Sequence, residues 1–341
     1  MSAKPFLDVF RSAQPARPPI WMMRQAGRYL AEYRAIRSQA KNFLDFCYTP
    51  DLAIEATLQP IRRFAFDAAI IFSDILVIPD ALGQGVRFAE GEGPRLDALE
   101  TREALQGLSK KLDRAKLEPV YEALRGTRAA LPKETTLIGF CGAPWTLATY
   151  MIAGRGTPDQ APARTFAYRD PEAFAGLIDL LTDACIDHLI AQIEAGAEVV
   201  QIFDSWAGTL PLREFQAWGE KPVTTIIAAV KARFPNVPVI AFPRAISGGY
   251  NRFVTATKCD AISLDTSAVL TEARAALPDS VVTQGNLDPL VLISGGKALD
   301  QAIDDILLAV SGKRHIFNLG HGILPQTPIE HVERLVARVR G

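Results

Sequence analysis

The chain alternates between short runs that are apolar throughout and longer stretches in which apolar residues recur every three or four positions. A run that is apolar on both faces is typical of a parallel strand covered by helices, whereas the longer spacing is typical of an amphipathic helix. We therefore expect eight strands, at residues 19–25, 66–74, 136–142, 197–205, 237–243, 260–266, 281–287 and 315–322.

Helix-start signals lie between these runs. Residues 49–51, Thr-Pro-Asp, combine a capping residue, a proline for the first helical position and an acid for the first turn. Residues 170–172 do the same for a stretch that ends near Gly196, and residues 327–330 form a capping-box pattern before the last helix. A further apolar helix is expected to begin near Pro144.

Eight strands interleaved with helices favour a (β/α)8 barrel, and a doubly wound sheet, which usually has fewer strands, is the alternative. Barrels of this length form one unit, so we expect a single domain over residues 1–341. Two stretches rich in Gly and Pro interrupt the pattern. Residues 79–99 are predicted to be a loop or hairpin inserted after the second strand, and residues 153–171 a long ordered loop.

The composition of the chain argues against nucleic acid or a membrane surface as its binding partner. The chain is 48% hydrophobic and 22% charged with a net charge of −1, which supplies no electrostatic case for nucleic acid or a membrane surface. The N-terminus lacks the apolar core of a secretory signal, and no uncharged apolar run approaches ~18 residues. The scattered thiols Cys47, Cys141, Cys185 and Cys259 predict reduced, buried cysteines. We expect a cytoplasmic protein that recognises a small molecule.

Polar residues stand where the predicted strands end, which is where barrels carry their functional groups. Asp74 lies between AAIIFS and ILVI, so its carboxylate is expected to be desolvated and to need N–H donors. Arg24 and Arg28 follow the apolar residues 21–23, which favours a pocket for an anion. A turn-capping aspartate and a solvated amphipathic segment are the alternatives. The other strand-end residues are Cys141, Asp204, Ser205, Arg244, Asp265, Asn286 and His321.

The remaining signals are further candidate residues and the absence of known motifs. His321 stands between glycines that allow close approach of a ligand, although a structural hydrogen bond explains it equally well. Tyr150 is expected to present its hydroxyl to the site, whereas Asp204 and Asp265 are better explained as capping or turn residues. Phosphate-binding loops, dinucleotide fingerprints, hydrolase elbows and zinc-ligand spacings are absent from the sequence. We therefore expect a site without metal or organic cofactor.

The segments PIWMMRQAGRYLAEYR and GFCGAPWTLATYM, together with IIFSDIL, IFDSWAG and NLGHGI in the same order, resemble the uroporphyrinogen decarboxylase family over essentially the whole chain. One departure is Ala31, where that family usually has proline. The resemblance implies a single (β/α)8 barrel, usually a homodimer. It also implies the cofactor-free conversion of uroporphyrinogen III to coproporphyrinogen III by removal of four acetate carboxyls as carbon dioxide, in haem or chlorophyll biosynthesis.

Carried over by position, the resemblance makes Asp74 the central catalytic residue, and Arg24 is a second candidate that would deliver a proton through a carboxylate or water. Arg37 also matches a cleft arginine, and Phe203 and Phe72 would supply an apolar wall. The implied substrate-binding set is Arg24, Gln25, Ala26, Gly27, Arg28, Asp74, Tyr150, Ser205 and His321. A corrinoid-linked methyltransferase with zinc held by thiolates and histidine, and a non-catalytic tetrapyrrole carrier, are the alternatives.

Overall fold

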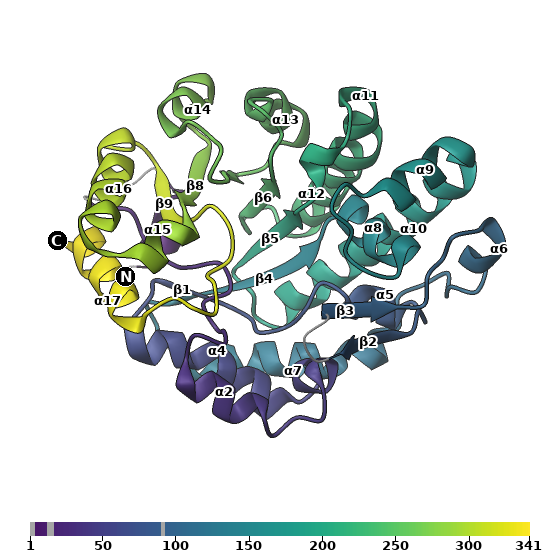
Figure 1. Ribbon diagram of the computed structural model, residues 1–341, viewed down its shortest axis with the longest axis horizontal. Coiled ribbons are helices and arrows are strands. Elements are labelled where there is room, and N and C mark those ends of the chain that lie inside the picture. Colours follow the sequence, from purple (N-terminus) through teal and green to yellow (C-terminus); the bar gives the residue numbers. More distant parts are fainter. Residues whose placement is uncertain (1–3, 12–16, 90–92) are drawn as a thin grey trace.

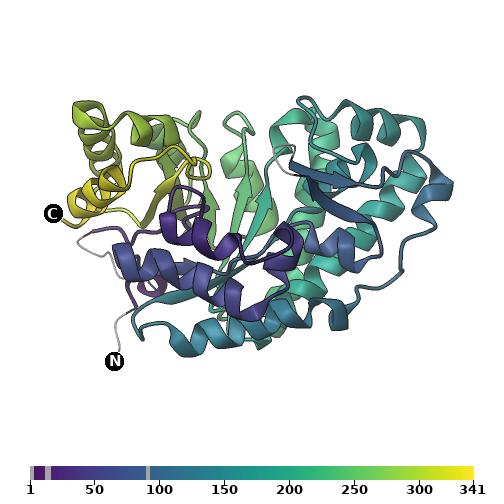
Figure 2. The ribbon, with the colours of Figure 1, turned by 60° about the horizontal axis from the view of Figure 1, so that its bottom comes forward.

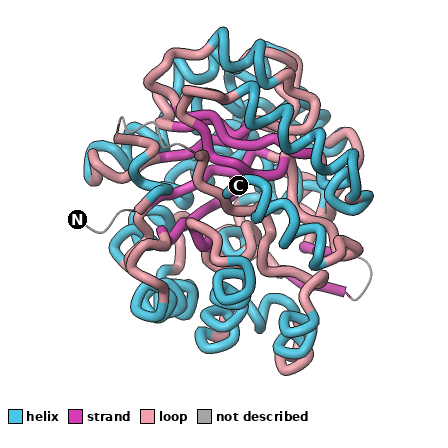
Figure 3. The backbone as a smooth tube through the Cα atoms, turned by 90° about the vertical axis from the view of Figure 1, so that its left-hand side faces the viewer, coloured by secondary structure: helices cyan, strands magenta, loops and turns pink. Residues whose placement is uncertain are grey.

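The computed structural model describes residues 4–11, 17–89 and 93–341. Seven parallel strands form one curled sheet in the order β1-β4-β5-β6-β7-β8-β9, and β2 pairs with β3 in a separate antiparallel sheet. The parallel strands lie in the interior, and helices surround them (Figures 1 and 3). The strands are β1 (Ala68–Ile70), β2 (Val86–Ala89), β3 (Gly93–Leu96), β4 (Thr136–Gly142), β5 (Val199–Asp204), β6 (Val239–Pro243), β7 (Ala261–Ser263), β8 (Val282–Leu287) and β9 (His315–Leu319).

Helices connect successive strands of the large sheet, and the last helix packs against α4 (Figure 2). In the described ranges, no helix combines the length and the apolar character needed to cross a membrane. A 3₁₀ turn spans Ala207–Thr209 and a π-helical stretch spans Phe215–Glu220. The helices are α1 (Pro5–Asp8), α2 (Ala31–Arg37), α3 (Phe43–Cys47), α4 (Pro50–Phe64), α5 (Val77–Ala81), α6 (Arg102–Leu105), α7 (Arg114–Ala130), α8 (Pro144–Ala153), α9 (Ala161–Arg169), α10 (Pro171–Glu194), α11 (Leu212–Glu214), α12 (Lys221–Arg233), α13 (Tyr250–Thr257), α14 (Leu270–Ala276), α15 (Pro289–Ser294), α16 (Gly296–Ala309) and α17 (Ile329–Arg340).

The segment predicted as the first strand, residues 19–25, is not a strand. Ile20 makes an isolated parallel bridge to Phe317 in β9, and on its other side the Ile20 carbonyl accepts from the N–H of Asp67 at 2.9 Å. The Asp67 carboxylate also accepts from the Ile20 N–H at 2.7 Å. Regular pairing stops there because the N–H of Met23 donates to a side chain and the backbone then turns. This segment thus lies between β9 and β1 with bonds to both.

The space enclosed by the strands is filled. Trp21 Nε1 donates to the Gln284 side-chain oxygen at 2.9 Å, and Gln284 Nε2 lies 3.2 Å from Gln201 Oε1 and 3.1 Å from Ser263 Oγ. Apolar side chains lie on both sides of this polar layer, and the cluster that they form includes Phe6 of α1. Because the interior is packed with side chains, a ligand has room only beyond the ends of the strands.

The two irregular stretches differ from their predictions in detail. Residues 79–99 contain the β2–β3 hairpin, and residues 90–92 of that stretch lie outside the described residues. Residues 153–171, predicted as a loop, contain α9, so the irregular part is short. The hairpin is tied to the end of α8 because the N–H of Leu96 donates to the Gly154 carbonyl at 2.8 Å.

The predicted helix starts are correct in position for α4, α8 and α10 but not in every cap. Asp170 caps α10 by accepting from the N–H of Ala173, whereas the Thr49 hydroxyl donates backwards to the Asp45 carbonyl. The capping box predicted before α17 is wrong, because the helix begins at Ile329 with a proline at its N-cap, and the buried Thr327 hydroxyl has no partner among the described residues.

Candidate active site

Arg24 lies at the turn that follows the bridging segment. Its φ of 63° belongs to the left-handed region, which is rare for residues other than glycine. The preceding Met23 is held on both sides, since its N–H donates to Asn318 Oδ1 and its carbonyl accepts from the N–H of Ile323, each at 2.9 Å. The aliphatic part of Arg24 packs so closely on Gly322 that an added Cβ there would collide with it. The loop after β9 therefore positions Arg24.

Asp74 lies four residues beyond β1 and is half-buried. Its Oδ1 accepts from the N–H of Leu76 at 2.8 Å, so the local-amide alternative is correct for one oxygen. Burial raises the pKa of Asp74, and the nearby charge of Arg24 opposes that rise. Within the described ranges the second oxygen has no hydrogen-bond partner, so it is free to accept from a ligand.

Tyr150 reaches the same region from α8. Burial raises the pKa of its hydroxyl, and the negative charge of Asp74 adds to this rise, whereas the Trp206 side chain and Arg24 oppose it. Trp206 Nε1 is buried without a hydrogen-bond partner among the described residues. Ser205, the residue after β5, is half-buried beside it. Residues after β1, after β5 and on α8 therefore converge on one region.

His321 completes the region from the loop after β9. Its pKa is lowered to about 4 by burial and by the positive charges of Arg24 and Arg244, against a smaller opposite effect of Asp265. The imidazole is therefore neutral near pH 7, with one nitrogen that donates and one that accepts.

Arg28 and Arg37 come from the segment before β1, since Arg28 precedes α2 and Arg37 is its last residue. Arg28 is solvent-exposed, as Arg24 is, so neither guanidinium bears the burial penalty expected from the sequence. Arg37 is half-buried, and its guanidinium lies 6.0 and 5.9 Å from the ring centres of Phe43 and Phe46. These two rings hold Arg37 against the aromatic cluster.

The two candidate wall residues occupy different layers. The Phe72 ring packs 4.5 Å from that of Phe46 and 5.6 Å from that of Tyr33, so it backs the loop that carries Asp74. Phe203 belongs to the apolar cluster inside the sheet, edge-on to Phe140. Phe72 is therefore behind the site and Phe203 beneath it.

The side chain of Gln25 is fully buried and engaged by protein. Its Nε2 donates to the Ala68 carbonyl at 3.1 Å, and its Oε1 accepts from the N–H of Met22 at 3.1 Å. The side chain thus fixes the turn that carries Arg24. Ala26 and Gly27, which follow it, are half-buried.

Asp204 is fully buried below the site. Its Oδ1 accepts from the Thr146 hydroxyl at 2.7 Å, and burial raises the pKa of its carboxyl to about 7. Asp265 accepts from the N–H groups of Ala245 and Ser267 at 2.6 and 2.8 Å. Both aspartates hold loops, as the sequence led us to expect.

We expect Asp204→Asn to stabilise the protein by up to about 4 kcal/mol at pH 8, because the rise of the Asp204 pKa from 3.8 to about 7 is worth about 1.4 kcal/mol per pKa unit. The folded-state pKa of about 7 lies above the ordinary value of 3.8, so the ionised wild type bears the full penalty above pH 7 and loses it as the pH falls towards 4. Denaturant unfolding from pH 4 to 8 measures the difference. An advantage of the variant that stays constant over this range contradicts the assignment.

The thiols offer no ligand set. All four cysteines are free and buried, and burial raises the pKa of Cys259 to about 12 and that of Cys47 and Cys185 well above the usual range. Across the described part of the chain, no group of three or more His, Cys, Asp or Glu side chains is arranged to hold a metal ion.

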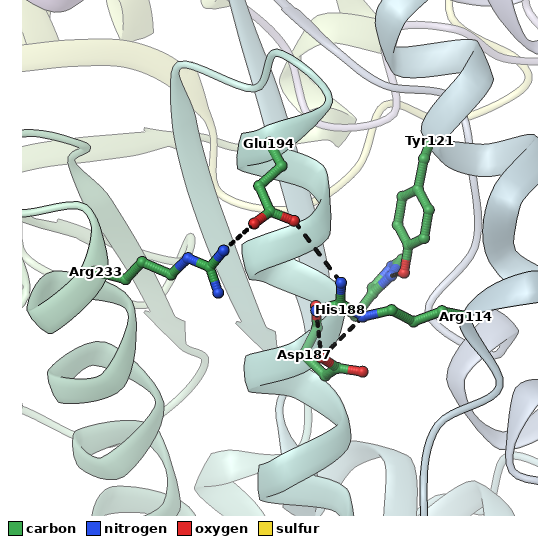
Figure 4. Close-up of polar contacts among 6 residues, drawn as sticks. All are labelled: Arg114, Tyr121, Asp187, His188, Glu194 and Arg233. Carbon is green, nitrogen blue, oxygen red and sulfur yellow. Dashed lines mark hydrogen bonds and ion pairs between the residues drawn. The ribbon is translucent and has the colours of Figure 1, made fainter.

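A second polar cluster lies in the outer helical layer, on α7, α10 and α12 (Figure 4). The Tyr121 hydroxyl lies 3.1 Å from Nδ1 of the buried His188, whose pKa burial lowers to about 3. Around this pair, Arg114 forms an ion pair with Asp187. Since these groups satisfy one another, the cluster is structural.

Three further positions build the site in ways that the sequence did not predict. Gly322 makes room for Arg24, Asn318 holds the preceding turn, and Trp206 lies beside Tyr150. Asn318 and Gly322 belong to the run predicted as the last strand, and Trp206 follows another predicted strand. Their roles could not be predicted because each acts through a residue distant in the chain.

The family model described as uroporphyrinogen decarboxylase matches residues 1–341. A protein of that name from Chelativorans sp. (strain BNC1) is 53% identical over 340 residues, covering 100% of this chain and 99% of the relative. One from Paracoccus denitrificans is 54% identical over 342 residues, with complete coverage of both.

Among solved structures, a methyltransferase from Methanosarcina mazei superposes with a TM-score of 0.75 at 16% identity, covering 98% of this chain and 96% of that one. A B12-independent methionine synthase from Shewanella sp. W3-18-1 gives a TM-score of 0.55 at 10% identity, with coverages of 85% and 87%. These likenesses concern the fold alone.

Proposed function

Because the chain belongs to the uroporphyrinogen decarboxylase family, we propose that it converts uroporphyrinogen III to coproporphyrinogen III, removing the carboxyl of each of four acetate side chains as carbon dioxide. The observation that supports this most directly is Asp74, a half-buried carboxylate with one oxygen that has no hydrogen-bond partner among the described residues. Anaerobic incubation with the substrate, followed by separation of products by their number of carboxyls, tests the proposal.

Asp74 suits the centre of this substrate, which presents four pyrrole N–H donors. An ionised carboxylate only accepts hydrogen bonds, so one group can collect converging donors. Those donors stabilise the charged form of Asp74 and offset the burial that raises its pKa.

The same charge favours the reaction. Protonation of a pyrrole carbon makes that ring an electron-poor cation, which accepts the electron pair left when carbon dioxide departs. The exocyclic methylene formed in this way takes up a proton to become the methyl group, and loss of the first proton from the ring carbon restores the aromatic pyrrole. An anion about 4 Å away stabilises this cation by roughly 4 kcal/mol at an effective dielectric constant of about 20. Since enzymes lower barriers by about 8–23 kcal/mol, orientation and proton delivery supply the remainder.

The arginines suit the rim of the substrate, which carries carboxylates. A guanidinium binds a carboxylate through two parallel hydrogen bonds and keeps its charge in an apolar surrounding. We assign Arg24 and Arg28 to rim carboxylates, and Arg24 also to proton delivery through a carboxylate or water. Tyr150, Ser205 and the neutral His321 would hold other carboxylates or a pyrrole edge.

We expect Arg28→Lys to raise KM about fivefold, corresponding to about 1 kcal/mol, because lysine keeps the charge but loses the paired geometry. Steady-state kinetics under anaerobic conditions measure this. Arg62→Lys, on an exposed arginine of α4 that pairs with Glu55, is the control and should leave KM unchanged. Unchanged kinetics for both variants would make Arg28 an ordinary surface charge.

The finer architecture belongs to the same proposal. We regard residues 1–341 as one domain that forms a (β/α)8 barrel. Residues 19–21 would take the place of a strand in this barrel, which is supported by their hydrogen bonds to β9 and to the residue before β1. The β2–β3 hairpin would be the insertion after the second strand of the barrel. The protein would act as a cytoplasmic homodimer, without metal or organic cofactor. Sedimentation equilibrium tests the dimer.

The alternative of a corrinoid-linked methyltransferase rests on likeness of fold at 16% identity, and the described thiols and histidines offer no zinc ligand set. A zinc assay on the purified protein distinguishes the two. A non-catalytic tetrapyrrole carrier would have no need for a desolvated carboxylate at this point.

A further inference from the structure

Arg244 is a half-buried cation immediately after β6. Its backbone is fixed, since its N–H donates to the Asp204 carbonyl at 3.1 Å and its carbonyl accepts from the N–H of Gly208 at 2.9 Å. Its guanidinium, in contrast, makes no hydrogen bond or ion pair with any described residue.

Strand register indicates where this side chain points. Phe203 of β5 pairs with Phe242 of β6, and both rings belong to the cluster inside the sheet. Because side chains alternate along a strand, the residues two positions further on, Ser205 and Arg244, continue the same inward-facing row. Arg244 therefore stands beside Ser205 at the end of the enclosed space.

The nearest acid does not neutralise it. Asp265 lies at the corresponding place after β7, but its carboxylate accepts from the N–H groups of Ala245 and Ser267 and from the Ser267 hydroxyl. No ion pair joins it to Arg244. Asp265 thus orders the loop after Arg244, and no carboxylate of the described ranges pairs with the Arg244 guanidinium.

Two other groups of the site face the same space. The positive charges of Arg24 and Arg244 both act on His321, which lies in the loop after β9. Arg24 also opposes the rise in the pKa of Asp74 that burial causes. The guanidinium of Arg244 therefore lies on the His321 side of this space.

We propose that Arg244 binds a carboxylate of the substrate that is retained through the reaction, namely a propionate. This rests on the proposed function. β6 lies three strands from β1 in the sheet, so Arg244 faces the rim of the macrocycle on the side away from β1, whereas Asp74 faces its centre. A contact on that side anchors ground state and transition state equally, which affects KM rather than kcat.

Arg244→Met should raise KM about 10- to 100-fold with kcat within about threefold, and Arg244→Lys should recover part of the loss. Arg213→Met removes one exposed charge from α11 and is the charge-matched control. An equal rise in KM for both methionine variants would show a general electrostatic effect, and a lower kcat at unchanged KM would place Arg244 in the chemistry. Either result overturns the proposal.

Binding of coproporphyrinogen III, measured anaerobically by ultrafiltration, separates this inference from the proposed function. Propionates are the only carboxylates that the product keeps, so Arg244→Met should weaken its binding about 10- to 100-fold. Unchanged affinity would overturn the inference. If the wild-type protein binds the product through Arg244 but decarboxylates nothing, the proposed function fails while the binding role stands.

Discussion

Asp74→Asn should lower turnover of uroporphyrinogen by about 10²–10³-fold while the protein remains folded. The amide keeps the size of the side chain and its oxygen still accepts from the N–H of Leu76, so the turn is preserved. What is lost is the negative charge that stabilises the protonated ring. Single-turnover measurements under anaerobic conditions follow this loss, and Asp204→Asn, which changes another buried acid outside the cleft, is the control.

The same substitution should change how the free energy of unfolding depends on pH. Burial raises the folded-state pKa of Asp74 above its ordinary value of 3.8, so the ionised side chain destabilises the fold at neutral pH. Wild type regains this stability as the pH falls from the raised folded pKa towards 3.8. Asp74→Asn should therefore be at least as stable as wild type at pH 7, with a smaller advantage near pH 4. Near-normal turnover would remove Asp74 from the mechanism.

Arg24→Gly should lower kcat/KM by about 10²-fold or more and still stabilise the fold relative to Arg24→Ala by about 1 kcal/mol. Glycine adopts the φ of 63° without strain, whereas alanine keeps the strain and both lack the guanidinium. The two variants should therefore lose activity alike and differ in stability, which is expected where a strained residue serves a ligand.

Thermal unfolding of the two variants, beside kinetics, separates these effects. Equal stability of Arg24→Gly and Arg24→Ala would contradict the strain, and full activity of either would remove Arg24 from the site. Arg63→Ala, on an exposed arginine that pairs with Glu32, removes a charge of equal sign elsewhere and should leave kcat/KM unchanged.

Much of the fold is predictable because burial leaves a local pattern. Seven of the eight apolar runs are strands, since each is covered on both faces. The strand predicted at residues 19–25 does not form, because strand pairing depends on residues distant in the chain. Ile20 bridges to Phe317 of β9, but the N–H of Met23 then donates to the side chain of Asn318 and not to a strand carbonyl. The pattern of apolar residues does not reveal that a side chain accepts this hydrogen bond.

For the site, the sequence predicts what is local. Apolar residues flank Asp74, which predicts its partial burial and the rise in its pKa, and both are found. The family resemblance implies that Gln25 binds substrate, whereas its amide bonds to Ala68, 43 positions away. Arg244 and Gly322 stand at or near the end of predicted strands, but their surroundings could not be predicted, because they depend on Arg24 and on the hydrogen bonds of Asp265, which are distant in the chain.

The most direct test of the central claim is the anaerobic conversion of uroporphyrinogen III, with products separated after oxidation according to their number of carboxyls. The account predicts successive intermediates with seven, six and five carboxyls, a final product with four, and release of four molecules of carbon dioxide per substrate. Recovery of the eight-carboxyl substrate unchanged, from folded protein that binds it, would contradict the account.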